Sequence, residues 1–277
     1  MRSLNRPLLF ATPLLLTLSL GVFSSASAAL TVEEIVHQSN KTVYFQGQDG
    51  RAQVNMTITD KQGRKRKRSL TILRLDESKS DDIKDGAYQG GQKFYVYFKR
   101  PSDVNKMAFL VWKHMKQDDD RWLYLPALDL VKRIAASDKR TSFVGSDFFY
   151  EDVSGRRLSE DNHELLETTD NYYIVKNTPK DPGSVKFAYY KIYIHKTSFI
   201  PVQVEYFDSN NTKYREAKAL AVDTVQGFPT VTKASMSNLL TGSTTIMAYR
   251  KVEYNVGLED SLFTERYLRK APKKQLR

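Results

Sequence analysis

The feature that most constrains this chain is a succession of stretches in which apolar and polar side chains alternate with a period of two. Val54, Met56 and Ile58, for example, each stand between polar residues. Successive side chains of a β-strand point to opposite faces of its sheet, so the alternation predicts strands with a buried face. Turn sequences such as Asp60-Lys61-Gln62-Gly63 separate these stretches, which predicts an antiparallel meander.

We expect about ten strands. They fall between residue 51 and the turn at 60–63, at 64–76, 91–100 and 107–115, from 121 onward, at 164–168 with 172–177, at 184–195 with 199–207, and at 213–224, 228–239 and 243–254. A capping box of Thr31 and Glu34 begins one short amphipathic helix that runs to about Lys41. Residues 261–269 form a short helix or a capping segment. No internal repeat or linker divides the chain, so residues 29–277 are expected to form a single domain.

Several of the expected strands carry apolar or aromatic residues on both faces. Tyr189, Tyr190, Ile192, Tyr193 and Ile194 show this most clearly. Such a sheet must either be covered on both sides or curl so that one face lines an interior. We therefore predict a mainly-β fold, a curved antiparallel sheet that holds a few helices on its concave side.

The first 28 residues have the pattern of a secretory signal peptide. Arg2 and Arg6 precede an apolar stretch at 8–23, and the small residues Ala26-Ser27-Ala28 form a cleavage site. The alternative is a membrane anchor, but Pro13 and three hydroxyl residues interrupt an apolar run that is short for a span of about 20 residues. We predict cleavage after Ala28 and a soluble, exported protein located in the periplasm.

The absence of cysteine and the strong positive charge narrow the possible partners. A chain without cysteine has no disulfide scaffold and no cysteine to carry an N-terminal lipid, which suits a large domain in a bacterial periplasm. A net charge of +11 favours an anionic partner, namely a membrane surface, a lipid head group or nucleic acid. Export makes nucleic acid the least favoured of the three, and we predict no nucleic-acid binding.

The residue types of common active sites are not gathered in this sequence. There is no nucleophile elbow and no glycine-rich phosphate loop. The four histidines stand singly and not at metal-ligand spacing: His37, His114, His163 and His195. Asp147, Glu151 and Asp152 are candidates for an acid–base pair, but structural hydrogen bonding is the favoured interpretation. We predict that the protein is not an enzyme and uses no cofactor and no metal.

A run of five cations has two interpretations. The run consists of Arg64, Lys65, Arg66, Lys67 and Arg68. It either forms a solvated strand end whose charges prevent edge-to-edge pairing, or it contacts anionic lipid or a membrane-protein partner. The sequence leaves both open.

Residues 121–152 carry the most specific pattern in the chain. Arg121-Trp122, Tyr124-Leu125-Pro126 and Arg133 are followed by Ser142-Phe143, Gly145-Ser146-Asp147-Phe148 and Tyr150-Glu151-Asp152. This pattern resembles the outer-membrane lipoprotein-sorting protein family, the LolA/LolB-like proteins, and in particular the branch found beside resistance–nodulation–division (RND) type exporters. The likeness extends over most of the chain after residue 28, including the closing Asp260, Leu262-Phe263-Thr264 and Leu268.

The resemblance implies an unclosed antiparallel half-barrel with a helical lid over a hydrophobic cavity that takes acyl chains. None of the functional residues of the dedicated lipoprotein carrier can be placed on this sequence. Without a lipobox cysteine, the chain cannot be the membrane-anchored receptor of that pathway.

Two functions remain as hypotheses. The first is a carrier of a lipid, a lipoprotein acyl chain or another hydrophobic cargo, with an RND-type exporter as a possible partner. The second is a non-catalytic interaction module, an accessory subunit that binds an envelope protein and has no cargo of its own. The residues expected to line a cavity, or alternatively to form ordinary core, are Phe94, Val96, Phe109, Val111, Trp122, Tyr124, Met236 and Met247.

Overall fold

The computed structural model describes residues 29–77 and 90–277. The chain divides into two units, Met1–Leu30 and Thr31–Arg277, and everything below concerns the second. The predicted signal peptide and its cleavage site lie outside the described residues. Within the part of the chain that the structure describes, no helix is both long and apolar enough to cross a membrane.

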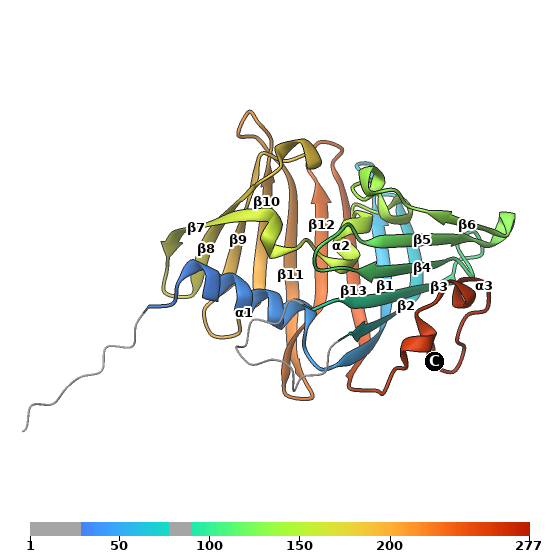
Figure 1. The fold of residues 1–277 in the computed structure, drawn as a ribbon. Helices are drawn as coiled ribbons and strands as arrows, with labels where there is room; N and C mark the ends of the chain where they lie inside the picture. Colours follow the sequence, from blue (N-terminus) through green and yellow to red (C-terminus); the bar gives the residue numbers. More distant parts are fainter. Residues whose placement is uncertain (1–28, 78–89) are drawn as a thin grey trace, which may run out of the picture. The chain divides into compact units, whose positions relative to one another are not determined.

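The described chain forms one antiparallel sheet of thirteen strands (Figure 1). In chain order they are β1 (Asp49–Thr59), β2 (Lys65–Asp76), β3 (Gln92–Arg100), β4 (Ala108–Lys113), β5 (Asp120–Leu125), β6 (Leu130–Arg133), β7 (Asp161–Thr168), β8 (Tyr172–Pro179), β9 (Tyr189–His195), β10 (Pro201–Phe207), β11 (Lys213–Val225), β12 (Phe228–Asn238) and β13 (Ser243–Tyr254). The prediction of a mainly-β meander is confirmed, with three more strands than the ten expected.

The order of strands departs from a simple meander at one point. Across the sheet the order is β6-β5-β4-β3-β2-β1-β13-β12-β11-β10-β9-β8-β7, so β1 pairs with the last strand and β6 and β7 are the two edges. After β6 the chain must therefore travel from one edge of the sheet to the other. Residues 134–160 make this crossing over one face, which we call the inner face, and include the short helix α2 (Tyr150–Ser154) (Figure 1).

Helix α1 (Val32–Tyr44) also covers the inner face, in front of the β8–β11 side of the sheet (Figure 1). The predicted capping box is present: the backbone N–H of Glu34 donates to Thr31 Oγ1 at 3.2 Å, and the N–H of Thr31 donates to Glu34 Oε2 at 2.8 Å. Two of the donors that a helix start leaves unpaired are thereby satisfied. Ile35 and Val36 are buried, which gives the helix the apolar side of the predicted amphipathic helix.

A packed cluster fills the inner face over β1–β5. Phe143 and Tyr150 of the crossing segment rest on Phe109, with ring centroids 5.3 Å and 5.2 Å from it. Phe98 and Leu70 are completely buried beneath them. This half of the inner face is therefore solid core.

The C-terminal segment covers the opposite face, the outer face, over β2–β5. It includes α3 (Glu265–Arg269), and it buries Phe263 and Leu268 against Tyr95 and Trp122. The hydroxyl of Tyr95 donates to the carbonyl of Tyr267 at 2.7 Å. Apolar residues on both faces of these strands thus follow from two separate covers, which is one of the arrangements that the sequence pattern requires.

Candidate functional site

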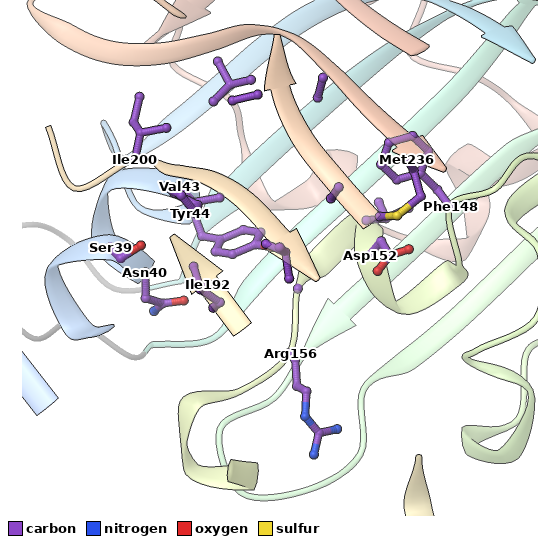
Figure 2. A pocket seen from close by; sticks show the side chains of 18 of the residues that line it. Ser39, Asn40, Val43, Tyr44, Phe148, Asp152, Arg156, Ile192, Ile200 and Met236 are labelled. Atoms are coloured by element: carbon purple, nitrogen blue, oxygen red, sulfur yellow. The ribbon is translucent and has the colours of Figure 1, made fainter. Parts of the chain in front are cut away.

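A cavity of about 480 Å³ lies on the inner face, between the sheet, α1 and the crossing segment. Figure 2 shows Ser39, Asn40, Val43 and Tyr44 of α1 on one side of it, with Met236 and Phe148 on another. The cavity occupies the β8–β13 half of the face, beside the packed cluster, and extends to Phe94 on β3.

Most of the cavity wall is apolar. Its aliphatic and aromatic members include residues of α1, β3, β9, β10, β12, the crossing segment and the β9–β10 turn: Val36, Val43, Phe94, Phe148, Phe149, Ile192, Ile194, Ile200, Val204 and Met236. Small side chains on the neighbouring strands leave the space open. Val204 on β10 lies opposite Ala217 on β11, which in turn lies opposite Met236 on β12. An alanine between two larger residues leaves a hollow that an apolar guest can fill.

Tyrosines add hydroxyl groups that stay protonated. Burial raises the pKa of Tyr249 to about 12, and burial also raises the pKa of Tyr44 and of Tyr206. Tyr190 donates from its hydroxyl to Asp161 Oδ2 at 2.7 Å. At neutral pH these groups are hydrogen-bond donors and not bases.

One part of the wall is charged. Arg156 donates from Nε to both oxygens of Asp161, at 3.1 Å and 3.0 Å. In Figure 2 the Arg156 side chain extends away from the apolar side chains. Glu151 lies within ion-pair distance of Lys139 at 3.5 Å and of Arg156 at 3.7 Å. The cavity therefore combines an apolar wall with a buried ionic cluster.

The crossing segment is fastened to the sheet over this cavity by its acidic residues. Asp147 Oδ2 accepts a hydrogen bond from Thr245 Oγ1 at 2.7 Å. Asp152 pairs with Arg215, whose guanidinium stacks 3.9 Å from the centroid of the Phe149 ring. These contacts give Asp147 and Asp152 a structural role, the interpretation favoured from the sequence.

The structure separates the eight residues predicted to line a cavity into three groups. Phe94 and Met236 line it, and Phe94 also belongs to the packed inner-face cluster. Val96, Phe109, Val111 and Met247 belong to the packed inner-face cluster. Trp122 and Tyr124 share one face of β5, and this is the outer face, beneath the C-terminal segment. Binding roles for Phe94 and Met236 remain predictions, and the other six lie in packed clusters.

Sequence reasoning missed most of the wall. Ile192 and Ile194 were noted as part of a two-faced strand but not as cavity residues, and the α1 residues Val36 and Val43 were not considered. The signal available was the small-residue alternation Ala217-Lys218-Ala219 on β11, which marks a strand face with little side-chain volume.

The predicted basic run begins β2, and the strand alternation divides it. Arg66 and Arg68 turn to the inner face, where they donate to the carbonyls of Gly145 and Val144. Lys65 and Lys67 point the other way and are exposed, and Arg64 pairs with Asp60 at 2.7 Å. Lys65, Arg66 and Lys67 are thus exposed and form no ion pair with any described residue, and of these three only Arg66 donates to a carbonyl.

Metal-ligand geometry is absent from residues 29–77 and 90–277, where no three His, Asp or Glu side chains gather in a way that would hold an ion. His114 pairs with Asp120 at 2.9 Å, and His163 contacts Asn177 at 2.6 Å. These histidines have structural partners.

Comparison with known proteins shows one matching protein family. A family model whose description is that of an uncharacterized protein matches residues 90–270. No protein of curated function matches the chain.

Solved structures share the fold over almost their whole length. A DUF1329 family protein from Desulfovibrio piger is 27% identical with a TM-score of 0.75, over 85% of this chain and 97% of that one. A protein from Vibrio parahaemolyticus, named for an outer membrane lipoprotein-sorting domain, is 25% identical with a TM-score of 0.74, over 86% and 97%. A LolA superfamily protein from Nitrosomonas europaea is 18% identical with a TM-score of 0.65, over 86% and 100%, and supports the fold alone. The predicted resemblance to lipoprotein-sorting proteins and the unclosed LolA-like sheet are both confirmed, whereas the branch beside RND-type exporters stays a prediction.

Proposed function

The chain belongs to the uncharacterized family whose model covers residues 90–270, and from this premise we propose that it is a carrier that binds a lipid or another hydrophobic cargo in the inner-face cavity. The observation that carries the proposal is the cavity itself, since a wall of aliphatic residues around about 480 Å³ is a poor environment for water. Similarity to a protein named for lipoprotein sorting supports the same class of cargo.

The size of the cavity indicates that it holds one acyl chain and not several. Small-molecule sites occupy about 300–1,000 Å³, and this cavity falls within that range. Burial of an acyl chain stabilises a complex by about 0.8 kcal/mol per methylene, or about 8 kcal/mol for ten methylenes before ordering costs. A single chain of about this length is therefore sufficient for tight binding without any catalytic chemistry.

We place the carrier in the periplasm. The motif at residues 1–28 supports export. Hand-over of cargo to an RND-type exporter is proposed on the family resemblance alone.

A basic and apolar surface supports transient contact with an anionic membrane. Lys65 and Lys67 are exposed on β2, close to the β1–β2 turn. The β12–β13 turn adjoins that turn, because the position of a Cβ on Gly242 is 3.3 Å from the Cβ of Lys61. This second turn exposes Leu239 and Leu240, at 45% and 74%. Cations beside exposed leucines suit a charged lipid surface.

Native mass spectrometry of protein purified from its own envelope tests the carrier proposal. We expect an added mass that matches a lipid or fatty acid and that organic extraction removes. An empty cavity together with a stable complex with an envelope protein would favour the interaction module instead.

A further inference from the structure

Arg140 is a cavity residue whose charge has almost no partner. Its side chain is only 11% exposed and lines the cavity. The guanidinium donates no hydrogen bond to any of the residues that the structure describes, and its Nη1 is buried. Its nearest carboxylate oxygen, Glu151 Oε2, is 4.0 Å from Nη1. A guanidinium has five donors, so a group in this position has strong binding capacity in reserve.

The neighbouring carboxylates are committed to other cations. Arg157 Nη2 donates to Glu160 Oε1 at 2.8 Å, and Asp161 is bound by Arg156 on both oxygens. Burial would raise the pKa of Glu160, but Arg157 and Arg156 lower it below its ordinary value. Glu160 is therefore ionised, and its charge is balanced by these arginines.

Only Glu151 remains for Arg140, and it is shared. Lys139 lies 3.5 Å and Arg156 3.7 Å from its Oε1, both closer than Arg140 is to its Oε2. In this cluster four cations, Lys139, Arg140, Arg156 and Arg157, surround three carboxylates, Glu151, Glu160 and Asp161. The cluster therefore has one positive charge in excess, and its least paired cation, Arg140, lines the cavity together with Arg156 and Glu151.

A neutral donor lies within the electrostatic reach of Arg140. Tyr214 also lines the cavity, and its hydroxyl donates to no residue in the described ranges. Burial raises the pKa of Tyr214, Asp152 and Asp208 add to that rise, and Arg215 and, most weakly, Arg140 oppose it. The hydroxyl is therefore protonated at neutral pH and is available to an oxyanion.

We propose that Arg140 binds the anionic head group, a carboxylate or a phosphate, of a single-chain amphiphile whose tail lies along the apolar wall at Ile192 and Val204. The proposal rests on the carrier function above and narrows its substrate class from hydrophobic molecules to acidic ones. Guanidinium groups bind carboxylate and phosphate through paired charge-assisted hydrogen bonds, which are about twice as strong as neutral ones. The excess charge beside Glu151 then gains its counter-ion only when cargo is bound.

The experiment compares probes of equal chain length that differ in the head group. Binding of dodecanoate, monododecyl phosphate and dodecanol to the full exported chain is measured by displacement of a fluorescent fatty acid. We expect the wild type to bind the two anions at least tenfold more tightly than the alcohol. Arg140→Gln should weaken binding of the anions by about ten- to a hundredfold while the affinity for dodecanol changes less than twofold. Arg140→Lys, which retains the charge, should recover part of the loss.

Lys132→Gln is the matched control, because it removes one positive charge from an exposed site on β6 that does not line the cavity. It should leave all three affinities unchanged. Circular dichroism confirms that each variant is folded, and Arg140→Lys serves as the test if Arg140→Gln does not fold.

The outcomes separate this proposal from the carrier function. If the wild type binds all three probes equally, or Arg140→Gln binds dodecanoate and monododecyl phosphate as tightly as the wild type, the head-group site is wrong and the carrier function stands. If no probe binds the wild type, both are wrong. If inorganic phosphate alone displaces the fluorescent probe as well as monododecyl phosphate does, the site takes a free anion and the amphiphile is excluded.

Discussion

The boundary between cavity and packed core gives the sharpest prediction, because the same substitution should have opposite effects on its two sides. Ile192 on β9 lines the cavity and is partly exposed, whereas Val111 on β4 is 0% exposed beneath the crossing segment. We consider aspartate at each position. At Ile192, which is partly exposed, the new carboxylate can reach solvent, while at Val111 it has neither water nor a cation.

The magnitudes follow from burial and mass action. An unpaired buried charge costs several kcal/mol, against a total stability of about 5–15 kcal/mol, so Val111→Asp should unfold the protein or leave it marginal. Dodecanoate at a hundred times its Kd stabilises a carrier by about 2.7 kcal/mol. For a domain of this size that corresponds to a rise in Tm of roughly 5–11 °C. Ile192→Asp should remain folded but lose this rise, because desolvating the new carboxylate weakens binding by more than a hundredfold.

Thermal unfolding with and without dodecanoate measures both effects. Ile192→Leu, which conserves volume, is the control and should keep the ligand-induced rise in Tm. A folded Val111→Asp, or an Ile192→Asp variant that keeps the full rise, would refute the assignment of these faces to core and cavity.

Three further predictions concern other parts of the chain. Replacing Lys65 and Lys67 with glutamine should weaken binding to anionic vesicles about thirtyfold, at about 1 kcal/mol per cation, and raised salt should have the same effect. The control Lys132→Gln should leave vesicle binding unchanged. If neither the double substitution nor salt weakens binding, the basic run only protects the strand end from edge-to-edge pairing. Burial lowers the pKa of Lys113 to about 8 from 10.5. The unfolded chain therefore binds the proton on Lys113 more tightly than the folded chain does. The free energy of unfolding of the wild type should rise between pH 8 and 10.5 relative to that of Lys113→Met. Parallel plots of this free energy against pH for the two proteins would contradict the prediction. Sequencing of the exported protein should begin at Ala29, and an intact N-terminus would exclude cleavage after Ala28.

The alternation of apolar and polar residues was sufficient to predict the sheet, but not the segments that cover its two faces. The period of two in β1 and β3 depends on neighbouring residues only, so the strands and the antiparallel turns could be predicted. The pairing of β1 with β13 joins the two ends of the chain, and no local signal encodes it. The crossing of residues 134–160 over the inner face follows from that pairing, so it could not be predicted from the sequence either.

The cavity was only partly predictable for the same reason. Val96 and Ile192 both belong to strands with apolar faces, and nothing in their own sequence distinguishes them. What differs is the cover: Phe143 and Tyr150 fill the space above Val96, whereas the small Ala217, one strand beyond Val204, leaves space on the face where Ile192 lines the cavity. Both interpretations of the basic run treated its five cations as one group, but strand alternation sends alternate cations to opposite faces.

A photoactivatable fatty acid with a diazirine in mid-chain tests the central claim, that acyl cargo lies in the inner-face cavity. The labelled protein is digested, and the modified residues are identified by mass spectrometry. We predict labels on α1 and on β9–β12, at residues such as Val43, Ile192 and Met236, that excess dodecanoate suppresses. Labels on the C-terminal segment of the outer face, or labels that excess dodecanoate does not reduce, would contradict the account.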